Sequence, residues 1–485
     1  MRGHSPQRNE TGLTGPVVVS VGLLLMVAAP VIRGGNRHVA LIMLEAVALV
    51  LLPLLVWQLS SPSVLSRRRF RAVVVLALAP VWVGLIQLAP LPPGLWSVLP
   101  GRSVYLQSLD AIQMPVGLWR PVSLMPDATA LSVLAGLPIA AAFLMAWLLS
   151  SPQLWLMIRV VVIGAFLQAF AGLLQVALLR ELYFGAMAYG RAIGSFANPN
   201  HFASYLAMSL PLVILLFRRA LAGEADTTGG MSRRRRSGVR GTLTSASQPV
   251  MAAWWGSVLF FILAALLASL SRAGLAAGLV AGLAAAVLLP ISELSDREKR
   301  WRLAGVTLAA VAVTASVGID GLLQRIAGSG SGTDGATRWQ LFKATWEAAR
   351  AFFPFGSGLG SYAGVFPQFQ PLEISGFAEY AHSDFIQLLM ECGLLFLGLA
   401  ALAVWLIVRQ TRDITQRWQQ HPGEPDLLLQ ISCGFGLLAV FLHSWLDFNL
   451  RIPANAMLAA FLFGAFLRPV KLRAGADPQR TTSPA

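Results

Sequence analysis

Charged residues are scarce in this sequence: Asp, Glu, Lys and Arg together form 12% of its 485 residues, against about 25% in soluble proteins. A globular chain of this length cannot cover its surface with so few charges, and disordered or coiled-coil chains contain many more. Apolar residues make up 56% of the chain, and the mean hydropathy is +0.66. This composition excludes those classes and indicates an integral membrane protein that crosses the bilayer many times.

Motifs for several kinds of chemistry are also missing. The two cysteines, Cys392 and Cys433, lie in apolar runs and give no sign of a disulfide or a metal site. The sequence has no His/Cys cluster for zinc, no paired aspartates to hold a metal on a diphosphate, and no P-loop for an ATP-driven pump. Glu45 is the main charged residue inside an apolar run, and no internal repeat is found, which argues against an ion-coupled transporter. We therefore expect no metal and no cofactor.

Long apolar runs are abundant. A transmembrane helix needs about 20 apolar residues, and about twelve such runs predict an all-α, polytopic integral membrane protein in a single domain over residues 1–485. The first run is interpreted as a retained helix, because Arg33 and polar residues follow it instead of a cleavage site for a signal peptide. The runs are 16–32, 39–59, 72–90, 128–149, 154–177, 200–217, 251–270, 273–290, 303–317, 384–407, 427–445 and 454–468.

The basic residues predict the orientation of these helices. With a cytoplasmic N-terminus, 24 of the 37 Lys and Arg residues fall on the cytoplasmic side and 12 on the other. This bias places both termini in the cytoplasm. The densest run, 233–236, is then a topology anchor near anionic lipid. No aromatic residues or nucleic-acid-binding motif accompany it, so the net charge of +15 is no evidence for a nucleic-acid partner.

Two loops on the external side are long, 91–127 and 318–383. Long loops inside a compact protein usually have a function or are disordered. The second loop separates the ninth and tenth predicted helices, contains Arg338 and ends at His382. Its stretch from Arg338 to Trp346 fits an amphipathic helix lying on the membrane surface.

Three of the six histidines, His201, His382 and His443, lie where an apolar run meets the external face. His382 has the richest polar surroundings, and histidine suits a general base because it titrates near neutral pH. His382 is therefore the predicted base. For His201 and His443 a structural role at the end of a helix is the favoured interpretation.

A stripe of polar residues follows His382. If the tenth helix starts near Ser383, then Asp384, Gln387 and Glu391 are three and four residues apart and share one face of an apolar helix. Such a face should point into the helix bundle. The alternative is that Ser383 or Asp384 only caps the helix and that His382 is an interfacial side chain.

The sixth predicted helix begins with a typical capping pattern. Asn198 suits the N-cap and Pro199 the first helical position. The positive end of this helix then points outward, toward any anion bound there. Asn200 and His201 are in its first turn, and Arg191 lies a few residues before it.

Arg272 is the sole charged residue between two apolar helices, at the external end of a very short turn. A guanidinium there can hold phosphate oxygens through two parallel hydrogen bonds, which lysine cannot copy. An interfacial arginine without a ligand is the alternative. Arg338 allows the same interpretation with lower priority. A set of arginines with one base on the external face favours a transferase whose substrate carries its own phosphates.

These motifs resemble the O-antigen ligase and O-antigen polymerase superfamily of bacterial polysaccharide assembly. The resemblance covers about residues 155–460, and the terminal segment 443–455 is also similar to members of this group. The motifs that match in order are Gly-Ser-Phe-Ala-Asn-Pro-Asn-His-Phe-Ala (194–203), Ser271-Arg272 with Gly274, Arg338-Trp339, the Gly-rich run 354–362, and His382-Ser383-Asp384 with Gly393 eleven positions after the histidine.

The resemblance implies a metal-independent, inverting glycosyltransferase acting at the periplasmic face of the bacterial inner membrane. It implies a glycan donor carried on undecaprenyl pyrophosphate. The acceptor is lipid A–core in ligases, which complete lipopolysaccharide, and another lipid-linked glycan in polymerases, some of which make exopolysaccharide. The choice between ligase and polymerase stays open. The main alternative from another class is a multi-pass transporter or flippase of lipid-linked sugars.

Carried onto this sequence, the resemblance assigns the base that activates the acceptor hydroxyl to His382. It assigns Arg272 to catalysis and to pyrophosphate binding, with Arg191 and Arg338 as further pyrophosphate-binding residues. The supporting candidates are Asn198, Asn200, His201, Asp384 and His443.

Overall fold

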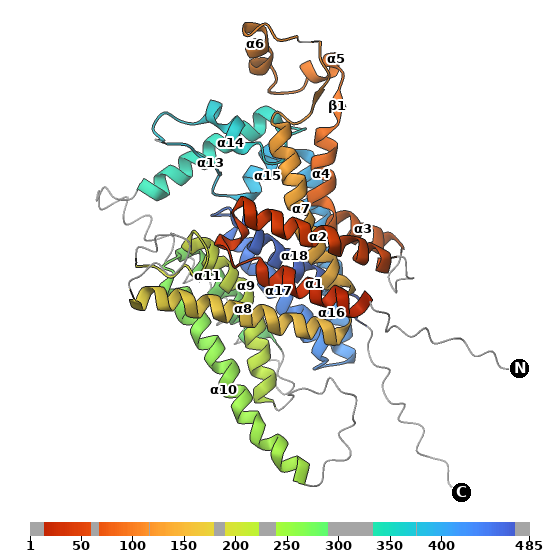
Figure 1. The fold of residues 1–485 in the computed structure, drawn as a ribbon, viewed down its shortest axis with the longest axis vertical. Coiled ribbons are helices and arrows are strands. Elements are labelled where there is room, and N and C mark those ends of the chain that lie inside the picture. The colour runs from red at the N-terminus through yellow and green to blue at the C-terminus, as the bar shows by residue number, and fades with distance from the viewer. Residues whose placement is uncertain are drawn as a thin grey trace, which may run out of the picture.

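The computed structural model describes residues 14–59, 67–115, 117–178, 190–222, 239–289, 333–374 and 376–470 (Figure 1). These ranges are mostly α-helical, and their only strands are the antiparallel pair β1 (Pro90–Leu91) and β2 (Arg120–Pro121). The predicted all-α class is confirmed for this part of the chain.

Within the described residues, seven helices are long and apolar enough to cross a membrane. The bent pair α3 (Arg67–Ala77) and α4 (Ala79–Leu88) counts as an eighth if it forms one span. The seven are α2 (His38–Leu59), α7 (Pro126–Leu148), α8 (Ser151–Leu178), α9 (Pro199–Leu221), α10 (Val239–Ala268), α16 (Leu394–Gln420) and α17 (Pro425–His443). Three shorter apolar helices are α1 (Thr14–Ala28), α11 (Arg272–Leu288) and α18 (Pro453–Leu467).

Each predicted apolar run inside the described ranges corresponds to a helix or to a pair of helices. The ninth run, 303–317, lies outside the described residues, as does the basic run 233–236. Several of the helices are shorter than a bilayer requires. A count of twelve spans is therefore not confirmed, and seven or eight helices meet the criterion.

Two runs predicted as single helices are broken. The third bends by 69° at Leu78, between α3 and α4. The tenth divides at Gly393 into the short helix α15 (Asp384–Cys392) and the spanning helix α16. Gly393 has φ 54° and ψ −128°, and the Leu394 amide after it donates to the Pro354 carbonyl at 2.8 Å. An inserted loop thus takes up a backbone donor at the break, and only glycine adopts this conformation without strain.

The helix α9 forms the centre of the bundle. Its most apolar window is 89% buried, and it contacts α8, α10, α11, α17 and α18. In Figure 1, α10 extends away from one side of this bundle, while α4 and α7 continue toward α5 (Pro93–Ser97) and α6 (Ser103–Ala111) on the opposite side. The first turn of α9 is the part that enters the site described below.

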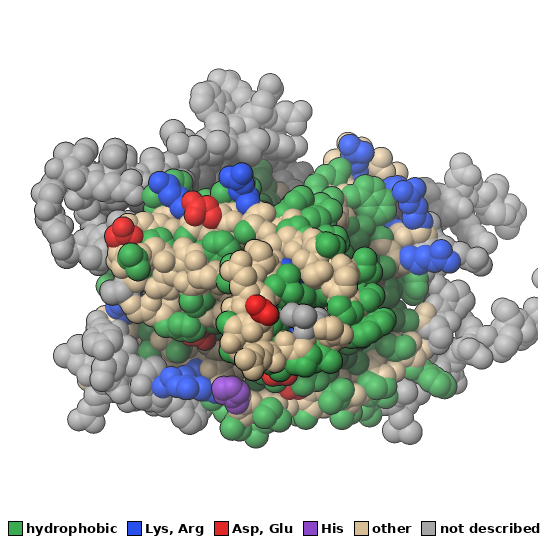
Figure 2. Space-filling model, turned by 90° about the horizontal axis from the view of Figure 1, so that it is seen from above, with side chains coloured by type: hydrophobic (Ala, Val, Ile, Leu, Met, Phe, Trp, Pro, Cys, Tyr) green, Lys and Arg blue, Asp and Glu red, His purple; other side chains and the backbone are tan. Residues whose placement is uncertain are grey.

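The end of the molecule that carries α5 and α6 also contains α13 (Thr333–Phe352), α14 (Tyr362–Val365) and η3 (Phe366–Phe369). These elements share a small apolar core that continues into α15. Figure 2 views this end and shows apolar side chains over much of the surface, with Lys and Arg mainly toward the margins. The stretch from Arg338 to Trp346 is helical, as predicted, and Trp339 and Trp346 are both exposed.

Gly393→Ala is expected to destabilise the protein by at least about 2 kcal/mol, because it adds backbone strain and a clash. A Cβ at this position would lie 2.1 Å from the Pro354 carbonyl oxygen. Gly398→Ala is the matched control, since Gly398 lies in α16 and a Cβ there meets no atom within 4 Å. Thermal unfolding of both variants in detergent measures the difference. Equal melting temperatures for the two variants would contradict the role given to Gly393.

Candidate active site

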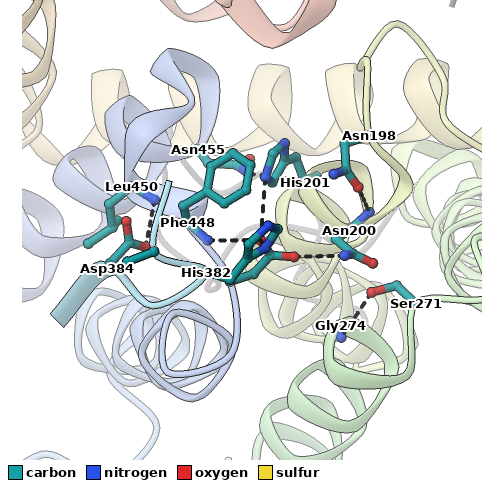
Figure 3. Close-up of polar contacts among 12 residues, drawn as sticks. Asn198, Asn200, His201, Ser271, Gly274, His382, Asp384, Phe448, Leu450 and Asn455 are labelled. Atoms are coloured by element: carbon teal, nitrogen blue, oxygen red, sulfur yellow. Dashed lines mark hydrogen bonds and ion pairs between the residues drawn. The ribbon is translucent and has the colours of Figure 1, made fainter. Parts of the chain in front are cut away.

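The Asp447 carboxylate, between α17 and α18, brings three parts of the chain together. Asn200 in α9 donates from Nδ2 to Asp447 Oδ2 at 2.7 Å, and the Phe448 amide donates to Oδ1 at 2.9 Å. His382 Nδ1 lies 3.3 Å from Oδ1 and His201 Nε2 lies 3.9 Å from it. Figure 3 shows Asn200, His201 and His382 close to one another. The Asp447 side chain is 1% exposed, so its charge is neutralised by protein groups rather than by bulk water.

His382 is oriented as a general base requires. An ionised carboxylate only accepts hydrogen bonds, so the Nδ1 that faces Asp447 carries the proton and Nε2 keeps its lone pair. The His382 side chain is 30% exposed, so part of it is accessible. Its backbone has φ 53°, an uncommon conformation for a residue with a Cβ. Such strain is frequent at functional positions, where the surrounding contacts maintain it.

Aromatic rings support this arrangement from one side. The Phe448 ring meets the His382 ring edge to face, with centroids 5.0 Å apart, and the His201 ring at 4.6 Å. Tyr380 stacks on Phe448 with centroids 4.2 Å apart. The rings restrict the two imidazoles without competing for their polar atoms.

Asp447 stays ionised in this environment. Burial raises its pKa, but the hydrogen bond with His382 and the nearby imidazoles of His201 and His443 lower it by more. The net result is a pKa below the ordinary range of aspartate. The carboxylate therefore acts as a permanent acceptor for the groups around it.

The first turn of α9 has the predicted cap. Asn198 Oδ1 accepts a hydrogen bond from the Asn200 amide at 2.8 Å, and Pro199 opens the helix. His201 is 4% exposed, and its carbonyl accepts from Asn455 Nδ2 at 3.0 Å. This bond joins the start of α18 to the start of α9. The cap thus has a structural role, and Asn200 additionally reaches Asp447.

The predicted arginines lie around the same end of the bundle. Arg191 donates from Nε to the Ser269 carbonyl and from Nη2 to the Leu270 carbonyl, each at 3.0 Å. It therefore supports the turn that leads into α11. Arg272 is exposed at the first position of that helix. Arg338 in α13 is near enough to interact electrostatically with His443.

The first turn of α11 lies against α9 and α17. Ser271 Oγ accepts from the Gly274 amide at 3.3 Å and caps the helix. A Cβ on Gly274 would lie 2.5 Å from Ala203 Cβ and 3.1 Å from His443 Cε1, so this glycine permits the close approach. His443 is 1% exposed, and its ring nitrogens have no hydrogen-bond partner among the described residues. Its ring is therefore a buried polar group at the edge of the site.

The helix α15 separates this polar site from an apolar groove. Its residues Asp384, Gln387 and Glu391 are all buried, while its opposite face contributes to a cavity of about 530 Å³. Lys343 is the one charged residue among the described residues that line the groove. The lining comprises Trp339, Phe342, Lys343 and Trp346 from α13, Phe385, Ile386 and Leu389 from α15, Phe396 and Leu397 from α16, and Trp445.

Sequence reasoning missed Asp447 and Arg451 as parts of the site. Both occur in the polar segment 443–455, but their partners are distant in the chain: Asn200 is 247 residues before Asp447, and Glu391 is 60 residues before Arg451. The available signal was a cluster of acidic and basic residues in a tight turn. No group of three or more His, Cys, Asp or Glu residues suited to a metal occurs in the described part of the chain.

The fold and site define a helical membrane protein in which a buried carboxylate contacts an imidazole at one end of the bundle. Residues 257–403 match the family model described as O-antigen ligase. The matched region contains Arg272, Arg338 and His382. This match confirms the resemblance to the O-antigen ligase and polymerase superfamily and supports a membrane enzyme of that type. No curated protein matches the chain.

Asp447→Asn is expected to lower the free energy of unfolding by about 2 kcal/mol at pH 7, because charge-assisted hydrogen bonds are lost. A depressed pKa stabilises the folded state above the pKa of the unfolded chain, about 3.9, and the gain is lost as pH falls through the folded pKa. The difference from wild type should therefore persist from pH 8 to about pH 5 and shrink only in stronger acid. Chemical unfolding in detergent at several pH values measures it.

The control for this substitution is Asp110→Asn, at an exposed position in α6. It should leave the unfolding free energy unchanged across the same pH range. A stability loss for Asp447→Asn that vanishes between pH 8 and pH 6 would contradict a lowered pKa for Asp447.

Proposed function

We propose that the protein is a glycosyltransferase of the O-antigen ligase/polymerase type. It transfers a glycan from undecaprenyl pyrophosphate to an acceptor hydroxyl at the periplasmic face of the bacterial inner membrane. The observation that carries the proposal is the His382–Asp447 pair, in which the imidazole is 30% exposed while its Nδ1 contacts a buried carboxylate. The family match over residues 257–403 supports the same class of reaction.

The chemistry follows from this geometry. His382 Nε2 accepts the proton of the acceptor hydroxyl while its oxygen forms a bond to the anomeric carbon. The bond from that carbon to the pyrophosphate oxygen breaks, and the electron pair leaves with the diphosphate. Attack on the face opposite the leaving group inverts the anomeric centre. Asp447 stabilises the imidazolium that forms, because its carboxylate contacts Nδ1 at 3.3 Å.

Positive groups at the same end of the bundle suit a diphosphate leaving group. Arg272 lies at the first position of α11, where helix amides and the helix dipole also favour anions. The start of α9 contributes a second helix N-terminus within the same site. Arg338 adds charge from α13, and Arg191 supports the turn before Arg272. These groups can stabilise developing negative charge without a metal ion.

The apolar groove suits the lipid part of the donor. A polyprenyl chain needs an apolar surface that leads to the reacting phosphate, and the groove lies on the other face of α15 from the polar site. Phe385 and Ile386 line it and are three and four residues from His382. In this arrangement the carrier lies along α13 and α15 with its pyrophosphate directed to the arginines.

The proposed orientation agrees with how the polar segments pair. Loops assigned to the periplasm contact one another, as in the links of Asn200 and His382 with Asp447. Segments assigned to the cytoplasm also meet, since Arg69 pairs with Asp413. These contacts fit either orientation of the bundle, and the excess of basic residues on the Arg69 side supports a cytoplasmic location for both termini and a periplasmic active face.

His382→Ala is expected to abolish glycan transfer, by a factor of about 10² or more, because the acceptor hydroxyl loses its base. His421→Ala is the control, since His421 ends α16 outside the site. Complementation of a deletion strain, with lipopolysaccharide banding and secreted polysaccharide analysed separately, measures the loss. Normal polymer with His382→Ala at normal membrane abundance would overturn the proposal.

The same strain distinguishes the acceptors. Uncapped lipid A–core with accumulated lipid-linked polymer indicates a ligase. Single repeats on the core, or loss of exopolysaccharide, indicate a polymerase. If the protein is instead a transporter or flippase, purified membranes of the deletion strain should retain glycan transfer, while translocation of the lipid-linked sugar fails.

Arg272→Lys tests the pyrophosphate contact. Lysine keeps the charge but not the paired donors of a guanidinium, so transfer should fall by at least about tenfold. Transfer from a polyprenyl-pyrophosphate-linked glycan in detergent is the measurement, with exposed Arg412→Lys in α16 as the matched control. A wild-type rate of transfer for Arg272→Lys would contradict the proposal that Arg272 binds the leaving pyrophosphate.

A further inference from the structure

Glu391, at the end of α15, is fully buried and uses both carboxylate oxygens. Its Oε2 accepts a hydrogen bond from Arg451 Nη2 at 2.7 Å, which also makes an ion pair. Its Oε1 accepts from Gln387 Nε2 at 3.1 Å. The residue therefore connects α15 to the segment that follows Asp447.

Gln387 continues this connection toward the proposed base. Its Oε1 accepts from the Ala381 amide at 3.1 Å, and Ala381 directly precedes His382. His382 has a positive φ, so a fixed neighbouring amide helps to maintain its conformation.

Arg451 belongs to the segment that carries Asp447, the second residue of the proposed catalytic pair. It lies in the 3₁₀-helix η4 (Asn449–Arg451), four residues after Asp447. The same turn is attached to the start of α15, because the Leu450 amide donates to Asp384 Oδ2 at 2.9 Å. A chain of hydrogen bonds thus connects Ala381, through Gln387 and Glu391, to Arg451. This chain does not include the His382–Asp447 contact.

From these contacts we infer that Glu391 is a positioning residue, which together with Arg451 sets the separation of His382 and Asp447. This inference rests on the proposed function. Glu391 touches neither reacting atom. A buried ion pair commonly adds little net stability, because the cost of desolvation offsets the attraction between the charges. A misplacement of about 1 Å in a catalytic pair, by contrast, can lower the rate on the order of 100-fold.

The double variant Glu391→Leu/Arg451→Met tests the inference, since it removes both charges and refills the space. We expect a melting temperature near that of wild type and a kcat lower on the order of 10-fold to 100-fold. The KM for a polyprenyl-pyrophosphate-linked glycan should change little, because neither residue contacts it. A folded double variant with wild-type kcat overturns the inference.

A second variant tests the positioning role of Glu391 if the double variant does not fold. Gln387→Met leaves the Glu391–Arg451 pair in place and cuts the link to Ala381. It should lower kcat at unchanged KM, and an unchanged kcat rejects the positioning role. His382→Ala in the same assay separates the two proposals. If His382→Ala is inactive while both other variants are fully active, only the positioning role fails; if His382→Ala is active, the proposed function itself fails.

Discussion

The buried negative charge of Asp447 is the constraint around which the site is organised. A carboxylate that is 1% exposed must be met by donors from the protein. Here those donors come from α9, from the segment before α15 and from its own turn. Satisfying one charge therefore requires three distant segments to meet at the same end of the bundle. His382 is one of the groups that meet this requirement.

The short helix α15 is the second organising element, because its two faces serve different purposes. The buried polar face is joined at both ends to the turn after Asp447, through Asp384 and Glu391. The other face lines an apolar groove. The break at Gly393 makes this division possible, since it frees α15 from the direction of the spanning helix α16. The short helix α15 thus lies between the apolar groove and the polar site.

Much of the framework was predictable from local patterns. The apolar runs located the helices, and the Asn198-Pro199 pair correctly marked the start of α9. The polar stripe on α15 followed from helical spacing. The breaks at Leu78 and Gly393 were not predicted, since both lie within continuous apolar runs. At Gly393, a loop from about 40 residues earlier supplies the acceptor for the displaced backbone amide.

Hydropathy and the placement of basic residues are local properties, and they alone were enough to predict a helical membrane protein with polar groups in the segments between its helices. Which of those groups meet is a different question. The contacts of Asp447 with Asn200 and His382 span 247 and 65 residues of chain. Such pairings depend on how the helices pack, because hydrogen bonds act over about 3 Å and carry no trace in local sequence periodicity. Only the tertiary structure could therefore select Asp447 as the partner of His382 and Arg451 as the partner of Glu391.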